Sequence, residues 1–266
     1  MITVNDICRL LEDFAPLSYQ ETYDNAGLIL GLRDVDVTGV LICLDVTEAV
    51  IDEAIDLKFN MIVSHHPLIF KGIKSITGKN HIENCLVKAI KNDIAIYAGH
   101  TNVDSVRHGV NGKMAEKLGL QNCRILVPGA ASGNIDGEEY GLGMVGDLPS
   151  AESEKAFLNR VKNTFCCERL RYSEPTGKLI CKVAVCGGSG SEFIEQAKAA
   201  GADVFLTGEA RYHDFFTKGQ NILMIDAGHY ETEQFTKEVF LDLISKKFPT
   251  FAVRISGSEK NPVYYL

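Results

Sequence analysis

The sequence predicts an α/β protein made of two related βαβ lobes that face each other across a metal-binding cleft. Two observations carry this prediction: short apolar runs alternate with amphipathic segments, and the pattern of the first half of the chain returns in the second half. A strand, a covering helix and a second parallel strand form a βαβ unit, and such units build sheets with helices on their faces. Histidines and carboxylates at predicted strand ends indicate the cleft.

The first lobe begins with an N-terminal segment that has the pattern of a helix. Residues 40–44 are a continuous apolar run, which is typical of a buried strand. In residues 48–57 apolar side chains recur with a helical period, and residues 61–63 are again apolar, so the three segments predict a βαβ unit. A helix over 85–91 and a strand over 94–98 extend this unit into a largely parallel sheet.

The boundary between the lobes is predicted near residue 125, which gives a first lobe of residues 1–125 and a second of residues 126–266. Glycines punctuate the chain just beyond this point, at 129, 133, 137, 141, 143 and 146. The interpretation leaves open that the C-terminal tail packs back on the first lobe. In the second lobe the same patterns predict helices over 151–163, 191–200 and 231–247 and strands over 182–186, 204–207 and 222–226.

The repetition extends to individual residues. Residues 53–64 match residues 196–207 in helix, turn and strand, 143 residues later. A strand that ends in Ala-Gly-His at residues 98–100 returns at residues 227–229, 129 residues later, and in both cases a carboxylate follows the histidine by four residues. The pattern indicates an internal duplication in which the two carboxylates, Asp104 and Glu233, hold equivalent positions.

Composition excludes several classes of protein. With 45% hydrophobic and 23% charged residues, the chain has the balance of a globular protein and not that of a disordered, collagenous or coiled-coil chain. Its apolar runs are far shorter than the ~20 residues of a membrane helix, so no membrane partner is expected. The 35 acidic and 27 basic residues give a formal net charge of −8 without a basic cluster, which disfavours nucleic acid as a partner.

The N-terminus and the cysteines indicate a compartment. The first residues lack the basic and hydrophobic regions of a signal peptide, which predicts a cytoplasmic protein. The eight cysteines include no Cys-x-x-Cys pair, and several lie in apolar runs. They are interpreted as buried, reduced thiols, which suit a reducing compartment.

Histidines and carboxylates at the ends of predicted strands form a candidate metal site. His65 and His66 follow a strand, and Pro67 favours an extended backbone in which neighbouring side chains point in opposite directions. His229 and Glu233 are four residues apart at a helix start and so share one face, a spacing that metal sites on helices use. Ligands of α/β sheets bind at the carboxyl ends of the strands. Each pattern taken alone also fits an exposed histidine pair or a solvated helix face.

A glycine-rich segment, Cys186-Gly-Gly-Ser-Gly-Ser191, lies between a predicted strand and a predicted helix. Backbone amides at a helix start can bind phosphate, but the segment lacks a complete Walker or Rossmann motif. A tight turn in which Ser191 caps the helix is the alternative interpretation.

Five motifs in combination resemble the family of GTP cyclohydrolase I type 2 homologues. They are Ser64-His-His-Pro-Leu-Ile-Phe70, Gly99-His-Thr-Asn-Val-Asp104, Thr207-Gly-Glu-Ala-Arg-Tyr-His213, Asp226-Ala-Gly-His-Tyr-Glu-Thr-Glu233 and Asn261-Pro-Val-Tyr264. The resemblance runs from Asp24-Asn-Ala-Gly-Leu28 to the C-terminus, with Tyr23 where a Trp is expected. It implies a toroidal homohexamer with a dinuclear metal centre, in the short form that lacks the PII-like domain of longer members.

The resemblance also implies a set of metal ligands. Two divalent ions per chain are expected on His65, His66, Asp104, His229 and Glu233, with Glu233 bridging. Mixed imidazole and carboxylate ligands suit Zn, Fe, Mn, Co or Ni, so the identity of the metal stays open.

Three further residues are candidates for catalysis. His100 is not among the usual ligands of the family and is expected to orient a ligand or to transfer a proton. Glu209 and His213 match a family motif beside the site, although a helix-start acid and a helix-borne histidine are an equally simple interpretation.

The resemblance implies a metal-dependent hydrolase, and the expected reaction is opening of the guanine ring of GTP with release of formate. Two divalent ions outweigh the charge of two carboxylates, so a small anionic substrate such as a nucleotide is expected. The same site suits a dinuclear-metal phosphoesterase or a non-catalytic, hexameric metal-binding scaffold with a regulatory role, and both alternatives stay open.

Overall fold

The computed structural model describes residues 1–129, 139–217 and 219–266 of the chain, and the predicted turn glycines 133 and 137 lie outside these residues. By its internal contacts the chain divides into two compact units. Unit 1 comprises Met1–Val103 and Thr236–Pro262, and unit 2 comprises Asp104–Phe235 and Val263–Leu266. Each unit is an α/β structure around its own sheet, which confirms the predicted fold class.

The sheet of unit 1 has the strand order β1-β4-β3-β2-β11. Its strands are β1 (Gly27–Leu30), β2 (Val40–Cys43), β3 (Met61–Ser64), β4 (Ala95–Ala98) and β11 (Val253–Ile255). Only β1 runs antiparallel to its neighbour; the other pairs are parallel, as the βαβ pattern predicts. The helices are α1 (Val4–Phe14), η1 (Leu17–Tyr19), α2 (Glu48–Leu57), α3 (His81–Lys91) and α9 (Thr236–Lys247).

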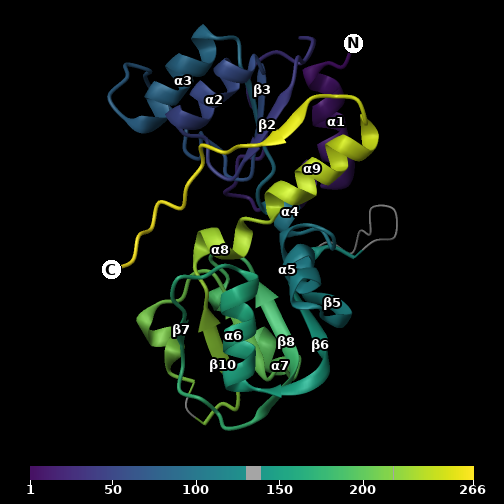
Figure 1. Cartoon of the computed structure of the whole chain (residues 1–266), viewed down its shortest axis with the longest axis vertical. Coiled ribbons are helices and arrows are strands. Elements are labelled where there is room, and N and C mark those ends of the chain that lie inside the picture. Colours follow the sequence, from purple (N-terminus) through teal and green to yellow (C-terminus); the bar gives the residue numbers. More distant parts are fainter. Residues whose placement is uncertain (130–138, 218) are drawn as a thin grey trace. The chain divides into compact units, whose positions relative to one another are not determined.

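Alternation along the strands explains how the helices of unit 1 attach. Leu41, Ile62 and Ile96 point to the face covered by α2 and α3, where they join one buried cluster with apolar residues of both helices. The opposite face of the sheet is covered by α1 and α9, which contact each other (Figure 1). Because both faces are covered, the central strands β2, β3 and β4 are buried along their whole length.

The sheet of unit 2 has the order β5-β6-β8-β9-β10-β7. Its strands are β5 (Gln121–Pro128), β6 (Gly141–Ser153), β7 (Arg171–Tyr172), β8 (Leu179–Cys186), β9 (Val204–Thr207) and β10 (Leu223–Asp226). Its helices are α5 (Val110–Leu118), α6 (Glu154–Thr164), η2 (Ser191–Phe193), α7 (Ile194–Ala199), η3 (Tyr212–Phe215) and α8 (His229–Glu233). The short helix α4 (Thr101–Asp104) carries the chain from unit 1 into unit 2.

The predicted boundary near residue 125 falls inside β5, which pairs with β6 over Gln121–Pro128. The glycines after β5 therefore mark a connection between two antiparallel strands of one sheet, while the contacts divide the chain at Val103 and again at Phe235. After Phe235 the chain returns to unit 1, where α9 packs and β11 pairs with β2. Long-range pairing of this kind leaves no local signal in the sequence.

Most predicted elements are present, and the differences have local causes. The predicted helix over 231–247 is two helices, because α8 ends at Glu233 and α9 begins at Thr236. The helix expected at residue 85 begins at His81, since the Asn80 side chain caps it by accepting a hydrogen bond from Glu83 N. The first three residues of the helix expected over 151–163 belong to β6.

The duplication is visible in the strand registers. Val40 pairs with Met61 in unit 1 as Val183 pairs with Val204 in unit 2, so β2-β3 and β8-β9 correspond at a separation of 143 residues. The backbone N of Gly99 donates to Ser64 O as that of Ala227 donates to Thr207 O, a separation of 128. The Ala-Gly-His motifs are therefore one residue out of register, and the equivalence of Asp104 and Glu233 is wrong by one position. The extra residue is Gly228, with φ +98°, so His229 lies inside α8 while His100 precedes α4.

The eight cysteines are unpaired, and their burial corrects the prediction in part. Five are buried, at positions 8, 43, 85, 167 and 186, but Cys123 is half-buried and Cys166 and Cys181 are exposed. Burial raises the pKa of the Cys8 thiol to about 11 and that of Cys167 to about 12. The buried thiols therefore act as apolar side chains at neutral pH.

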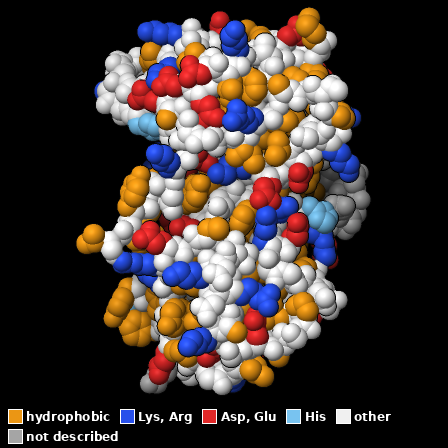
Figure 2. Space-filling view, viewed as in Figure 1, with side chains coloured by type: hydrophobic (Ala, Val, Ile, Leu, Met, Phe, Trp, Pro, Cys, Tyr) orange, Lys and Arg blue, Asp and Glu red, His pale blue; other side chains and the backbone are white. Residues whose placement is uncertain are grey.

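The surface agrees with the charge balance of the sequence. On the face shown in Figure 2, Lys and Arg side chains are interspersed with Asp and Glu side chains. Within the described residues, no helix is long and apolar enough to cross a membrane.

A buried carboxylate at the start of α3 predicts acid sensitivity. Glu83 accepts hydrogen bonds from the backbone N of Thr77 at 2.7 Å and from that of Lys79 at 3.3 Å. The bond from Thr77 is the largest influence, and together the donors lower the pKa of Glu83 from 4.5 to about 2. A depressed pKa stabilises the fold above pH 4.5 and this stabilisation is lost as the pH falls toward 2. In urea unfolding, Glu83→Gln should be less stable than the wild type at pH 6, and the difference should shrink at pH 3.

The matched control is Glu116→Gln, which alters an exposed carboxylate that pairs with Lys113 on α5. This variant should stay close to the wild type at both pH values. A difference between Glu83→Gln and the wild type that is as large at pH 3 as at pH 6 would contradict the assignment of a depressed pKa to Glu83.

Candidate functional site

The first part of the candidate site follows the carboxyl end of β3. His65 is completely buried, and its Nδ1 donates a hydrogen bond to the carbonyl oxygen of Gly99 at 2.8 Å. Because β4 is the parallel neighbour of β3, Gly99 lies directly beside the histidine. The bond fixes the tautomer with the proton on Nδ1 and the lone pair on Nε2, the atom that commonly binds metal.

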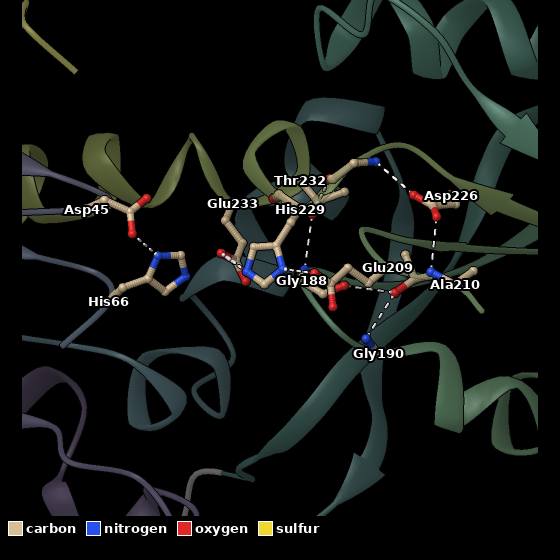
Figure 3. A network of polar contacts seen from close by, with 12 residues as sticks. Asp45, His66, Gly188, Gly190, Glu209, Ala210, Asp226, His229, Thr232 and Glu233 are labelled. Carbon is tan, nitrogen blue, oxygen red and sulfur yellow. Dashed lines mark hydrogen bonds and ion pairs between the residues drawn. The ribbon is translucent and has the colours of Figure 1, made fainter. Parts of the chain in front are cut away.

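His66 is oriented by a carboxylate from the next strand. Its Nδ1 donates to Oδ1 of Asp45 at 2.9 Å, and Asp45 follows β2 in the same parallel sheet (Figure 3). The backbone N of Asp45 donates in turn to Glu259 at 2.8 Å, and Glu259 is paired with Lys237. Residues of the returning C-terminal segment therefore hold the backbone that positions Asp45.

His100 has a third acceptor. Its Nδ1 donates to Oδ1 of Asp24 at 2.7 Å, and the backbone N of Thr101 donates to the second oxygen at 3.0 Å. Burial alone would raise the pKa of Asp24, but the hydrogen bonds from His100 and Thr101 outweigh it and lower the pKa to about 2. Asp24 is therefore a buried carboxylate that stays charged at neutral pH.

These three histidines form one cluster in unit 1. Their ring centroids are 4.9 Å apart for His65 and His66, 5.3 Å for His65 and His100, and 5.5 Å for His66 and His100. One ring nitrogen from each lies within 4.8 Å of the others, so the cluster could hold a metal ion. In each ring Nδ1 is bound to an oxygen, the arrangement that metal-binding imidazoles use, so the residues fit a divalent cation. His100, expected to act beside the metal, is thus also a candidate ligand.

Substitution of Asp24 tests this orientation. In Asp24→Asn the side chain keeps its size but loses the charge and one acceptor, so His100 is no longer fixed. We expect metal affinity to fall about 10- to 100-fold, the usual effect of removing a group that orients a ligand. Titration of the metal-free protein with Zn²⁺ in a calorimeter measures this.

Asp34→Asn changes an exposed carboxylate of unit 1 and serves as the control. Its affinity should equal that of the wild type. Equal affinities in all three proteins would mean that the Asp24–His100 hydrogen bond has no influence on the metal.

The second part of the candidate site is in unit 2, at the start of α8. His229 lies between two carboxylates, with Nε2 3.0 Å from Glu233 Oε2 and Nδ1 3.2 Å from Glu209 Oε1 (Figure 3). The i, i+4 spacing on α8 brings His229 and Glu233 together as the sequence predicts. Glu233 is almost completely buried, whereas the Glu209 side chain is 58% exposed.

The glycine-rich segment packs against this carboxylate. Gly188 has φ +59°, and a Cβ added there would lie 2.1 Å from Oε1 of Glu233. Its backbone N donates to Thr232 Oγ1 at 3.1 Å, while the N atoms of Gly187 and Gly190 donate to side chains of Asn111 and Thr207. These amides are therefore used within the protein, which favours a structural turn over a phosphate cradle. The helix-capping role of Ser191 is wrong, because Ser191 is the first residue of η2 and its side chain makes no capping hydrogen bond.

The remaining predicted residues have different surroundings. Asp104 ends α4 and is half-buried, and its carbonyl oxygen accepts a hydrogen bond from the Asn111 side chain at 3.1 Å. His213 is exposed on η3, and its ring contacts Tyr212 and Phe216. The predicted site residues thus fall into a histidine cluster in unit 1 and a carboxylate-flanked histidine in unit 2.

The structure adds carboxylates that the pattern search missed as functional residues. Asp45 comes directly after β2 and Asp24 precedes β1, so each could have been identified as a carboxylate near a strand of the same sheet. Glu259 lies close to the C-terminus, and nothing local in the sequence links it to Asp45. Its contact depends on the pairing of β11 with β2.

Comparisons with known proteins agree with the fold and the motifs. The family model described as "Duf34/NIF3 (NGG1p interacting factor 3)" matches residues 2–262. A protein of Clostridium acetobutylicum named "GTP cyclohydrolase 1 type 2 homolog" is 40% identical over 233 residues, covering 87% of this chain and 85% of that protein. One of the same name from Lactococcus lactis is 32% identical and covers 98% of both chains. The crystal structure of Staphylococcus aureus protein SA1388 has a TM-score of 0.90 at 29% identity, covering 100% of this chain and 99% of that one.

Proposed function

We propose, from the premise that the chain belongs to the Duf34/NIF3 family, that it is a hydrolase that depends on two divalent metal ions and acts on a nucleotide. One observation carries the proposal: His65, His66 and His100 form a cluster in which every Nδ1 is bound to an oxygen. Three oriented imidazoles in one place are a costly arrangement for a merely structural core, and they suit a metal ion.

The proposed ligands come from both parts of the site. His65 and His66 supply imidazole nitrogens from unit 1, and Asp104, His229 and Glu233 supply a nitrogen and carboxylate oxygens from unit 2. The donors are nitrogen and oxygen without thiolate, which suits Zn, Fe, Mn, Co or Ni. Bound there, two divalent ions supply Lewis acidity and make water a stronger acid.

The other polar residues hold or move protons. Asp24 stays charged and holds the Nδ1 proton of His100, so His100 Nε2 can accept a proton from water and return it to a leaving group. Glu209 holds the Nδ1 side of His229 while most of its own side chain remains accessible to solvent. His213 is proposed as a further proton donor, because it is exposed on the segment that follows Glu209.

The substrate proposal is GTP, with hydrolytic opening of the guanine ring and release of formate. Two relatives at 40% and 32% identity carry the name of a GTP cyclohydrolase homologue, and the proposed ions leave a net positive charge for an anionic substrate.

The experiment compares metal-loaded wild type with His65→Ala in the presence of GTP and of a panel of phosphodiesters, following formate and free phosphate or alcohol. Formate from GTP in the wild type alone supports the proposal. Cleavage of a phosphodiester without formate would replace it with a phosphoesterase. No turnover above the His65→Ala level would favour a metal-binding scaffold.

The assembly proposed with this function is a homohexamer in the cytoplasm. It rests on the family resemblance of the motifs and not on contacts within the chain. Sedimentation equilibrium should give six times the mass of 29.2 kDa, and a clean monomer would refute it.

A further inference from the structure

Unit 2 has a pocket of about 730 Å³ that the metal-site argument does not use. Its lining includes Arg171, Tyr172, Glu174, Tyr212, Phe215 and Phe216. The volume lies within the range of about 300–1,000 Å³ that is typical of small-molecule sites. Hydrophobic side chains are exposed in the region of β7 and η3 on the face shown in Figure 2.

Aromatic rings dominate the exposed wall of this pocket. Tyr172 is 50% exposed, Tyr212 73% and Phe216 62%, an unusual degree for three large side chains in one place. The rings of Tyr212 and Phe216 contact each other edge to face, with centroids 5.4 Å apart. This pair is therefore held in place while leaving ring surface accessible, which suits stacking of a planar aromatic ligand.

Arg171 adds a fixed cation to the aromatic wall. It lies opposite Asp226 in the antiparallel pair of β7 and β10, and its guanidinium donates to the Asp226 carboxylate and to Ala210 O. Its guanidinium carbon is 5.2 Å from the ring centroid of Phe215. A guanidinium held in this way can stack on a planar ring or donate to an acceptor atom at its edge.

The Asp226 carboxylate ties this pocket to the candidate site of unit 2. It accepts hydrogen bonds from the backbone N of Ala210 and from that of Gly228, both at 3.0 Å. Ala210 follows Glu209, and Gly228 precedes His229. The wall that carries Arg171 is therefore fixed to the two segments that supply the candidate residues.

We propose that this pocket binds a planar heteroaromatic ring by stacking it on Tyr212 and Phe216, with Arg171 at the edge of the ring. The choice of a purine base as that ring rests on the proposed function. The stacking site itself rests on the pocket, its exposed rings and the anchored guanidinium.

The test is calorimetric titration of metal-free protein with guanosine, and with ribose 5-phosphate as the probe that lacks the ring. Guanosine should bind and ribose 5-phosphate should not. Phe216→Ala and Tyr212→Ala should each weaken guanosine binding at least about fivefold, the lower end for loss of one stacking ring. Phe216→Tyr should retain binding, because it keeps the ring.

Leu179→Ala is the matched control, because it shortens a side chain of unit 2 that is 59% exposed and lies outside the pocket lining. It should bind guanosine like the wild type. Unchanged binding in both pocket variants would overturn the proposal, and so would a change in sedimentation in these variants alone, which would assign the aromatic wall to a second copy of the chain. Since the titration uses metal-free protein, a failure of GTP turnover would overturn the hydrolase and leave the ring-binding result standing.

Discussion

Replacing Glu233 with alanine is expected to remove both metal ions from the chain, whereas Asp104→Ala is expected to retain about one per chain. Glu233 lies in the first two turns of helix after β10, next to His229, and its almost buried carboxylate is confined by Gly188. A confined carboxylate with two oxygens can serve two ions, and the proposal assigns it that role. Asp104 is one methylene shorter and occupies a different register position, so it is assigned to one ion.

Metal content after dialysis, measured by mass spectrometry, distinguishes the two variants, and circular dichroism checks that both remain folded. Hydrolase activity should fall to the level of metal-free protein in Glu233→Ala. Equal loss of metal from both variants would mean that the two carboxylates are interchangeable and that the bridging role of Glu233 is wrong. Full retention in both would place the metal elsewhere.

Gly188→Ala is expected to abolish most metal binding without any change to a ligand. The added Cβ would lie 2.1 Å from Glu233 Oε1 and 3.4 Å from His229 Cε1, so Glu233 must move from its position beside His229. Ligands displaced by a fraction of an ångström bind metal poorly, and we expect metal affinity to fall at least about 100-fold, the upper end of the loss on removing a group that orients a ligand. The glycine-rich segment would then contribute to the site by close approach of its backbone.

Gly177→Ala is the matched control for backbone strain. Gly177 also has a left-handed conformation, with φ +75°, but an added Cβ would meet no atom within 4 Å. Both variants pay the left-handed cost of about 1 to 2 kcal/mol in stability. Zn²⁺ titration should show weakened binding in Gly188→Ala alone. Equal binding in the two variants would mean that Gly188 does not position Glu233.

The repeated strands explain why much of the fold could be predicted from the sequence. Strands β2, β3, β8, β9 and β10 are short, buried on both faces and followed by turns, so their apolar runs are a local signal. The antiparallel strand β7, by contrast, has only two exposed residues, and no local pattern could predict it. The units were misplaced because α9 and β11 return to unit 1 through contacts distant in sequence.

The site shows the same division between local and distant information. The motifs identified the histidines because each follows a strand, and His229 and Glu233 because their spacing suits a helix face. The partners that orient the rings come from elsewhere: Asp24 is 76 residues from His100, and Asp45 is 21 residues from His66. Their roles follow from the parallel neighbours in the sheet, which only the structure supplies.

The metal content of the wild-type chain, measured by elemental analysis after loading and dialysis, tests the proposed function most directly. The account predicts two divalent ions per chain in the wild type and a loss of metal, with retained secondary structure, in His65→Ala. A wild-type chain that retains no divalent ion, or a His65→Ala variant that retains the full wild-type content, would contradict it.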